Sequence, residues 1–338
     1  MPKCYNSGNI DNIYDSNLKK RIDKNFKNNT IKSKKQSKYR NCDGYEKIPH
    51  ILPKKKRIIA IGDIHGDYDL AINCFKLANL IDDKLNWIAS PPDTVVVQVG
   101  DQIDRCRPII GKSCNHPDTT LNDDGRDIDV LNLFNLLHQK ASKKGGAVIS
   151  LLGNHEIMNV QGMMTYVSHE GLKQFDDYIN PETGKKFESG LEARKYLFSR
   201  GNKYSQLLAC TRQTAIIIGS NLFVHAAILP KLSKDYNVKN INLLVKKWLL
   251  KQISTDKKVK GIGTVRDILN NINVSPFWPR ILGSLPPGLD IENDECINYM
   301  QETLFLYKCN NMIIGHTPQF YSNKSGISST CSGINKLN

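Results

Sequence analysis

Side chains that can bind a metal ion follow directly after three apolar runs in this 338-residue chain. Residues 62–66 read Gly-Asp-Ile-His-Gly, residues 100–105 read Gly-Asp-Gln-Ile-Asp-Arg, and residues 153–156 read Gly-Asn-His-Glu. Carboxylate, imidazole and carboxamide groups without thiolates suit hard or borderline divalent ions. Asp and Asn also cap turns, but three such motifs in one chain favour metal binding over turn capping.

Short β-strands must position these side chains, because each motif follows a run of apolar residues that a glycine ends. The carboxyl ends of neighbouring strands in an α/β sheet meet at one edge. Two later runs end in the same way: a predicted hairpin over 214–227 contains His225, and a predicted last strand, 311–316, ends in Gly-His. We therefore expect the strand ends to bring six candidate ligands together, namely Asp63, His65, Asp101, Asn154, His225 and His316.

Such a ligand set could serve the hydrolysis of a phosphate ester. A bridging Asp101 would let two ions lie about 3.5–4 Å apart, share an activated hydroxide and stabilise an in-line displacement at phosphorus. His155 would protonate the leaving oxygen, Asp104 would hold its imidazole, and Arg105 would bind the phosphoryl oxygens through its planar guanidinium. Pairing of Arg105 with an Asp or Glu is the alternative. The chain contains no Cys followed six positions later by Arg, so a cysteinyl-phosphate intermediate is not expected.

Helices and an insertion separate the motifs. Apolar spacing predicts helices over 68–80, 127–143 and 241–253. The mixed and polar segment 163–206 contains a turn signal, Asn-Pro-Glu-Thr-Gly at 180–184, and we interpret it as a helical insertion beside the site.

The charge of the chain lies mainly at its beginning. Through Arg57 there are 16 Lys and Arg against 5 Asp and Glu, so +11 of the net charge of +14 lies there. Residues 1–50 are rich in Lys, Asn and Ser and cannot bury enough apolar surface to offset ordering entropy, which predicts a flexible basic arm. A solvated tail is favoured over a weak contact with nucleic acid or an acidic surface, because interleaved aromatics and dense Arg are missing.

The nine cysteines are scattered and show no Cys-x-x-Cys spacing. Neither a signal-like apolar segment nor a run long enough to span a bilayer is evident, so a cytoplasmic, reducing location with free thiols is expected. Cys106 and Cys114 are interpreted as free thiols in a loop, with a redox switch at the mouth of the site as the alternative.

The motifs resemble, closely and in order, those of the calcineurin-like metallophosphoesterases, in their phosphoprotein phosphatase branch. Within that branch, residues 153–159, 161–162 and 166–168 resemble the bacterial-type, Shewanella-like protein phosphatases. The resemblance covers residues 55 to 335. It implies an α/β fold, an α/β/β/α sandwich of two mixed sheets flanked by helices, formed by a catalytic domain over 51–338 with a helical cap at 163–206. It also implies two divalent metal ions, for which Mn, Fe and Zn all fit.

The same resemblance assigns roles to individual residues. Asp63 and His65 would hold the first ion, Asp101 would bridge, and the second ion would be held by Asn154, His225 and His316. His155 would pair with Asp104 as the general acid. Residues 275–280, Ser-Pro-Phe-Trp-Pro-Arg, resemble the family's Trp-x-Arg segment and make Arg280 a second phosphate ligand.

This chain departs from the family pattern at three places. Cys106 and Ala226-Ala227 stand where glycine is usual, and the chain stops at Asn338, before the usual end of the fold, so a closing strand could be absent or replaced.

The leading hypothesis is a metal-dependent phosphomonoesterase that acts on phosphoprotein or phosphopeptide, at Tyr or at Ser/Thr. Two alternatives stay open: a hydrolase of dinucleoside polyphosphates or other nucleotides, and a non-catalytic binding module that tethers partners through its basic arm.

Overall fold

The computed structural model describes residues 41–319 and 327–337. The chain divides into two compact units, residues 1–38 and 39–338. Most of the predicted arm, residues 1–40, lies outside the described residues.

A four-stranded parallel sheet carries the three motifs. Its strands, in spatial order, are β2 (Ile58–Ile61), β3 (Val95–Gln98), β4 (Ala147–Leu151) and β5 (Arg212–Gln213). The sequences of β2, β3 and β4 are mainly apolar because a parallel sheet is covered on both faces. The register places Ala60 beside Val97 and Val97 beside Ile149, so β2, β3 and β4 end at the same edge.

A six-stranded mixed sheet contributes the two later histidines. In spatial order it contains β1 (Ile51–Leu52), β6 (Ala215–Ile218), β7 (Asn221–Val224), β10 (Asn311–Ile314), β12 (Ile334–Leu337) and β11 (Ile327–Thr330). The predicted hairpin is confirmed by the antiparallel pairing of β6 with β7. The prediction that 311–316 is the last strand is wrong, because β12 pairs with β10 in parallel and closes the sheet. A small separate sheet pairs β8 (Lys258–Val259) with β9 (Gly263–Thr264).

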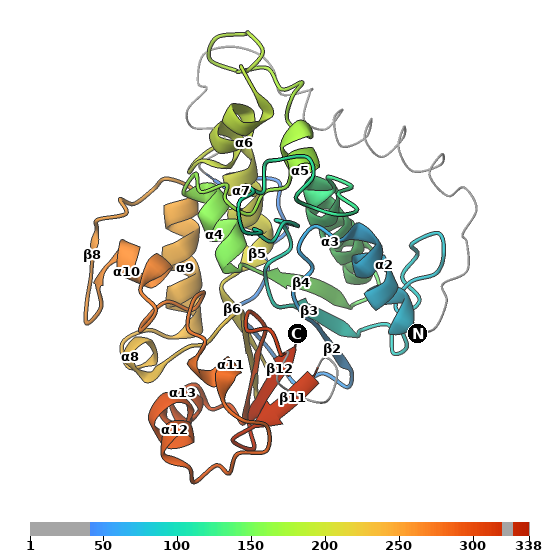
Figure 1. The fold of residues 1–338 in the computed structure, drawn as a ribbon. Coiled ribbons are helices and arrows are strands. Elements are labelled where there is room, and N and C mark those ends of the chain that lie inside the picture. Colours follow the sequence, from blue (N-terminus) through green and yellow to red (C-terminus); the bar gives the residue numbers. More distant parts are fainter. Residues whose placement is uncertain (1–40, 320–326, 338) are drawn as a thin grey trace. The chain divides into compact units, whose positions relative to one another are not determined.

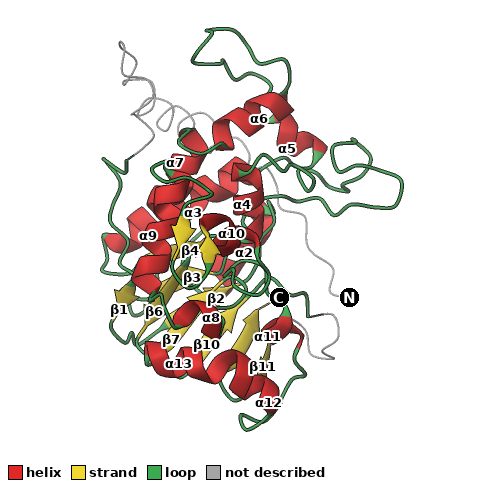
Figure 2. Cartoon of the chain, turned by 90° about the vertical axis from the view of Figure 1, so that its left-hand side faces the viewer, coloured by secondary structure: helices red, strands yellow, loops and turns green. Residues whose placement is uncertain are grey.

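The two sheets pack face to face through apolar side chains of β3, β4, β6, β7, β10 and β12. Helices cover them on the outside, with α3 packed on β4 and α9 packed on β6 (Figures 1 and 2). The predicted α/β sandwich is therefore confirmed, with one sheet entirely parallel. The helices are α2 (Tyr68–Leu77), α3 (Asp127–Ser142), α4 (Asn154–Val160), α5 (His169–Lys173), α6 (Gly190–Phe198), α7 (Lys203–Thr211), α8 (Pro230–Ser233), α9 (Val238–Leu249), α10 (Val265–Asn270), α11 (Ile281–Ser284), α12 (Asp294–Cys296), α13 (Glu302–Tyr307) and the π-helix η1 (Ile297–Gln301).

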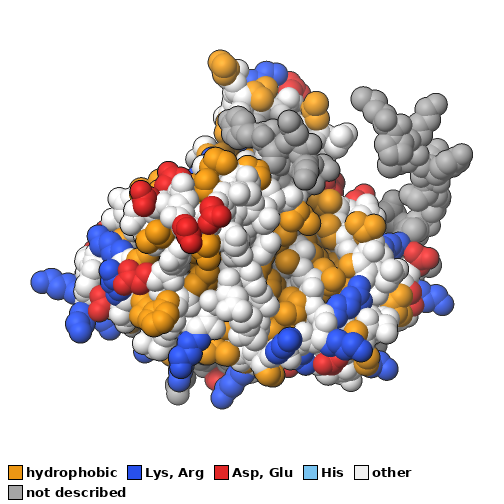
Figure 3. Space-filling view, turned by 90° about the horizontal axis from the view of Figure 1, so that it is seen from below, with side chains coloured by type: hydrophobic (Ala, Val, Ile, Leu, Met, Phe, Trp, Pro, Cys, Tyr) orange, Lys and Arg blue, Asp and Glu red, His pale blue; other side chains and the backbone are white. Residues whose placement is uncertain are grey.

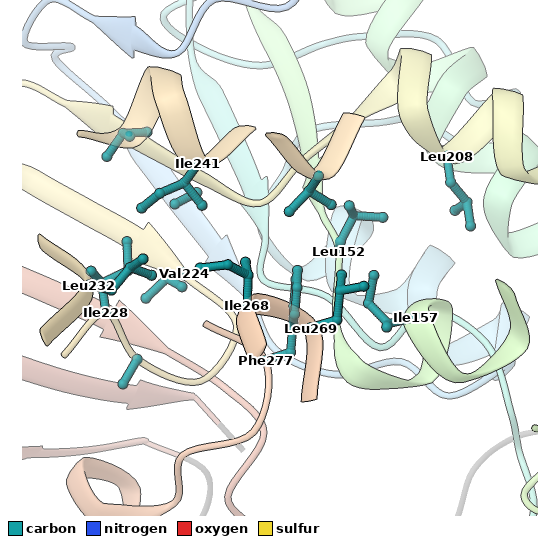
Figure 4. Packing of buried hydrophobic residues seen from close by; sticks show 14 of the residues in the cluster. Leu152, Ile157, Leu208, Val224, Ile228, Leu232, Ile241, Ile268, Leu269 and Phe277 are labelled. Atoms are coloured by element: carbon teal, nitrogen blue, oxygen red, sulfur yellow. The ribbon is translucent and has the colours of Figure 1, made fainter. Parts of the chain in front are cut away.

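A second apolar cluster joins the helices to the ends of the strands. Figure 4 shows Leu152, Ile157 and Leu208 on one side of this cluster and Val224, Ile228 and Ile241 on the other. The side chain of Phe277 also belongs to it, and this residue lies close in the chain to Arg280. The elements that carry the candidate ligands are thus anchored in two apolar clusters.

The segment predicted as an insertion contains α5, α6 and the first residues of α7. Helix α6 contacts both α5 and α4, the helix that follows the third motif. The division of the chain into an arm, a catalytic domain and a helical cap stays a prediction.

Residues 41–50, which fall in the predicted arm, are attached to the body. The Gln206 side chain donates a hydrogen bond to the Asn41 carbonyl over 2.7 Å, and the Gln213 side chain donates one to the Ile48 carbonyl over 2.8 Å. A disulfide between Cys42 and Cys210 fixes the same segment.

Three disulfides among the described residues overturn the prediction of a cytoplasmic, reducing location with free thiols. They join Cys42 to Cys210, Cys106 to Cys114, and Cys296 to Cys331. Disulfides form and persist in oxidising environments, so this set indicates such an environment for the folded chain. In the described part of the chain, Cys74 and Cys309 are free, and none of the helices there is long and apolar enough to cross a membrane.

The disulfides predict a ranked effect on stability. A cross-link restricts the unfolded chain more when it closes a longer loop. Cys42 and Cys210 are 168 residues apart, whereas Cys106 and Cys114 are 8 apart. We expect replacement of the first pair by Ser to lower the free energy of unfolding by about 4 kcal/mol, and of the second pair by about 2 kcal/mol. Urea unfolding of the oxidised proteins measures both values, and an equal loss from the two pairs would reject the ranking.

Candidate metal centre

The six predicted ligands lie where strands of the two sheets end. Asp63 and His65 follow β2, Asp101 follows β3, and Asn154 is the first residue of α4, directly after β4. In the other sheet, β7 and β10 are parallel neighbours, so His225 and His316 lie at the same edge. Two contacts join the sheets there: the His316 backbone N–H donates to Asp63 over 3.2 Å, and His225 Nδ1 lies 2.9 Å from the Val99 carbonyl.

Asp101 lies between two groups of candidate ligands. The atoms of His65, Asp101 and His155 that could bind a metal all lie within 4.8 Å of one another, and so do those of Asp101, His225 and His316. Asp63 faces both groups, with Oδ2 3.8 Å from His65 Nε2 and Oδ1 3.9 Å from His225 Nδ1. Asp101 is the residue common to the two groups.

The backbone at several of these positions adopts the left-handed conformation that L-residues disfavour. The φ angles are +49° at His65, +53° at Asp101, +70° at Asp104 and +66° at His316. Each such residue costs roughly 1–2 kcal/mol. Residues held in costly conformations cluster at functional sites, where the surrounding structure fixes them. The tight packing of the strand ends therefore fixes the directions in which these side chains point.

Glycine and a buried glutamate hold the motifs together. A Cβ atom on Gly100 would lie 2.7 Å from the Gly153 nitrogen and 2.8 Å from His225 Nδ1, so a larger residue would separate the two loops. The fully buried carboxylate of Glu156 accepts hydrogen bonds from the backbone N–H groups of Gly153, Asp101 and Gln102, over 2.6, 3.0 and 2.8 Å. The motif spacing did not reveal this supporting role of Glu156.

Burial and neighbouring charges shift the pKa values of the cluster in opposite directions. Burial raises the pKa of the Asp63 carboxyl to about 7, against the opposing effect of His225. Burial lowers the pKa of His65 and that of His316 to about 3, so both imidazoles are neutral. Burial alone would also lower the pKa of His225, but the carboxylates of Asp101 and Asp63 outweigh it and raise the pKa to about 9. The neutral imidazoles of His65 and His316 offer the lone pairs that a metal requires, whereas His225 would have to give up a proton to bind one.

The surroundings of His225 show that the donor set fits a divalent cation. Its Nε2 atom faces two oxygens, Asn154 Oδ1 at 2.9 Å and Asp101 Oδ2 at 3.2 Å. Its Nδ1 atom faces the Val99 carbonyl, which can only accept a hydrogen bond. A divalent cation could replace the Nε2 proton of His225, because imidazole, carboxylate and carboxamide groups all serve as ligands of such ions. The residues present therefore fit a metal bound through His225 Nε2.

His155 and Asp104, the predicted acid and its partner, are paired. His155 Nδ1 lies 2.9 Å from Asp104 Oδ2, and both side chains are buried. The other ring nitrogen, Nε2, lies 3.9 Å from Asp101 Oδ2. The His155 ring contacts His65 and Tyr166 edge to face, with centroids 4.8 and 4.9 Å apart. Nε2 is thus the nitrogen that points to the cluster.

Arginines border the cluster on two sides. Arg105 lines a cavity of about 360 Å³ together with His65, and its guanidinium pairs with Asp67 over 2.9 Å. Arg280 lies next to His316, with a nitrogen–nitrogen distance of 3.4 Å. Arg107, which was not among the predicted site residues, lines the same cavity as Arg105. It donates hydrogen bonds to the carbonyls of Asp104 and Cys106. No motif marked Arg107, because its place depends on the turn that follows Asp104.

The loop at the rim of this cavity is cross-linked. Cys106 and Cys114 form a disulfide, so the prediction of free loop thiols is wrong. Cys106 donates a backbone hydrogen bond to Tyr166, and the Asn115 side chain donates one to the Val167 carbonyl over 2.8 Å. The cross-linked loop is thereby attached to the segment before α5.

Comparisons with known proteins agree with this geometry. The family model for calcineurin-like phosphoesterases matches residues 56–319. An uncharacterized protein of Acanthamoeba polyphaga mimivirus is 42% identical over 209 residues, 59% of this chain and 80% of that protein. Shewanella-like protein phosphatase 2 of Arabidopsis thaliana is 29% identical over 225 residues, 58% of this chain; the match spans about half (52%) of that relative. The solved structure of a cold-active protein tyrosine phosphatase has the same fold, with a TM-score of 0.60, 21% identity, and coverage of 91% of this chain and 74% of that one.

Proposed function

This chain belongs to the calcineurin-like phosphoesterase family of hydrolases, and on that premise we propose that it is a metal-dependent protein phosphatase for phosphotyrosine or phosphoserine and phosphothreonine. One observation carries the proposal: two groups of candidate ligands share Asp101, and His155, which belongs to one of these groups, is paired with Asp104. A shared carboxylate is what two neighbouring metal ions require.

The proposed ligands divide around Asp101. Asp63 and His65 would hold the first ion with Asp101, and the second would be held by Asp101, Asn154, His225 and His316. When bound, a pair of Mn, Fe or Zn ions would act as Lewis acids and lower the pKa of a water molecule.

The side chains of this chain would bind the substrate and move the leaving proton. Arg105, which lines a cavity with His65, and Arg280, which lies next to His316, would orient the phosphoryl oxygens. Arg107 adds positive charge to the cavity that Arg105 lines. Arg105 pairs with Asp67 and would bind the substrate if the phosphate replaced this carboxylate as its partner. His155 would donate a proton from Nε2 to the leaving oxygen, while Asp104 keeps its Nδ1 proton in place.

Two relatives support a protein substrate over a nucleotide. One is named a Shewanella-like protein phosphatase, and the other is a protein tyrosine phosphatase of the same fold. On the face seen from below, Lys and Arg are scattered among apolar and uncharged side chains and form no single patch (Figure 3). This distribution offers the described body no broad basic surface for nucleic acid on that face.

A substrate panel tests the proposal. The full chain, supplied with Mn²⁺, would be assayed against phosphotyrosyl, phosphoseryl and phosphothreonyl peptides and against diadenosine tetraphosphate. We expect at least one phosphopeptide to be hydrolysed with a kcat/KM roughly 100-fold above that for the dinucleotide. Hydrolysis of the dinucleotide alone would favour the nucleotide hydrolase, and no turnover by protein with bound metal would favour the non-catalytic module.

A further inference from the structure

A fully buried arginine of the segment 163–206 contacts the general-acid pair. Arg194 lies on α6 and has no solvent exposure. Its Nη2 atom lies 3.0 Å from Asp104 Oδ1 and 2.8 Å from Asp127 Oδ2. Its Nε atom donates to Asn159 Oδ1 over 2.8 Å, and Nη1 donates to the Gly171 carbonyl over 3.1 Å. The guanidinium therefore joins four separate segments of the chain.

These contacts hold both the side chain and the backbone of Asp104 in place. Its Oδ1 atom accepts hydrogen bonds from Arg194 and Asn159, each over 3.0 Å. Its Oδ2 atom accepts from Asn159 over 2.9 Å and faces His155 Nδ1. Its backbone N–H donates to Asp127 Oδ1 over 3.2 Å, at the residue whose φ is +70°. Asp127 in turn is held by Arg194. The direction of the Asp104 carboxylate thus depends on Arg194 and on Asn159, which Arg194 itself holds.

We propose that Arg194 is a positioning residue for the general acid: it holds Asp104 so that His155 keeps its Nε2 atom directed at the leaving oxygen. This inference rests on the proposed function. Arg194 does not itself contact the cavity that His65 and Arg105 line. Its planar guanidinium can bond two carboxylates and a carboxamide at once, which the point charge of lysine cannot reproduce.

A purely structural role explains this arrangement less well. A buried ion pair contributes little net stability, because the desolvation of its charges offsets their attraction. Arg194 also lies over the rings of Phe175 and Phe198, at 5.4 and 5.1 Å, where an apolar side chain would pack without that cost. What the guanidinium supplies, and an apolar residue would not, is the orientation of Asp104.

The experiment compares two substrates that differ in their need for an acid. The phenolate of phenyl phosphate leaves only with a proton, whereas p-nitrophenolate leaves readily without one. We expect Arg194→Gln to lower kcat for phenyl phosphate by about 100-fold and for p-nitrophenyl phosphate by about 5-fold, with KM and bound metal retained. Arg194→Lys, which keeps the charge, should recover part of the loss. Arg200→Gln is the matched control, since Arg200 donates to the Ile253 carbonyl and lies outside this network.

Each outcome decides the inference. Equal losses for the two substrates in Arg194→Gln, or in Arg194→Lys where the Gln variant does not fold, overturn the positioning role. Full additivity of Arg194→Lys with His155→Asn also overturns it, because residues that act through one another are not additive. If the wild-type protein hydrolyses neither aryl phosphate, the proposed function fails first. If the wild-type protein is active and Arg194→Gln has the same ratio of kcat values for the two substrates as the wild type, only the role of Arg194 is rejected.

Discussion

Asp101→Asn is expected to lower kcat/KM for aryl phosphates and phosphopeptides by roughly 10⁴-fold or more. Asn preserves the shape of the side chain and can still accept the hydrogen bond that the His155 backbone N–H donates to Oδ1 over 3.0 Å. It replaces the other oxygen, or the same one after a flip, by an NH₂ group that cannot bind a cation. A residue with one ligand atom and no charge cannot serve both groups of ligands that meet at Asp101.

The same substitution should leave the fold intact. Removal of the Asp101 charge relieves its repulsion with the buried Asp63 carboxyl and removes its attraction to His225, so the two effects on stability oppose each other. Steady-state kinetics, metal content and thermal unfolding would be measured on the same preparation. Asp83→Asn, at an exposed residue paired with Lys76, controls for the loss of a carboxylate. A loss of less than about 10-fold with full metal content would contradict the shared-ligand account.

His155→Asn is expected to lower kcat by roughly 10²–10⁴-fold for a phosphotyrosyl peptide, with a much smaller loss for p-nitrophenyl phosphate. The tyrosyl leaving group needs a proton that His155 Nε2 would supply, and Asp104 already holds the opposite nitrogen at 2.9 Å. KM and metal content should change little, because the six proposed ligands are untouched.

The control for this prediction is His138→Asn. His138 is also largely buried and hydrogen-bonded, through the backbone N–H of Val148 at 3.3 Å, but it lies on α3 and not among the candidate ligands. The distances also allow His155 to act as a ligand together with His65 and Asp101. Loss of metal in His155→Asn, with equal losses for both substrates, would assign it that role and remove it as the acid.

The sequence predicted the strand ends well because local chemistry decides them. An apolar run, a glycine and then Asp or His can be recognised without knowledge of tertiary structure, and the parallel sheets then place Asp63, Asp101 and Asn154 at one edge. The hairpin that carries His225 was predictable for the same reason. Pairing of β7 with β10, which brings His316 to His225, follows from the family's topology and not from local sequence.

Features that depend on distant contacts were not predictable from local patterns. Cys42 and Cys210 become neighbours only because residues 41–50 lie against α7, so scattered spacing suggested free thiols. Arg194 lies in a polar segment without a motif, and its four partners come from separate elements. Strand β12 is short and contains Lys336, whose buried Nζ bonds backbone carbonyls, so it did not show the apolar pattern of a buried strand.

Metal content and turnover, followed together during chelation, test the central claim most directly. The full chain would be dialysed against a chelator, and samples would be assayed for divalent ions by mass spectrometry and for hydrolysis of p-nitrophenyl phosphate. The account predicts about two ions per chain at the start, loss of turnover in step with the ions, and recovery when Mn²⁺ is restored. Undiminished turnover by folded protein from which every divalent ion has been removed would contradict it.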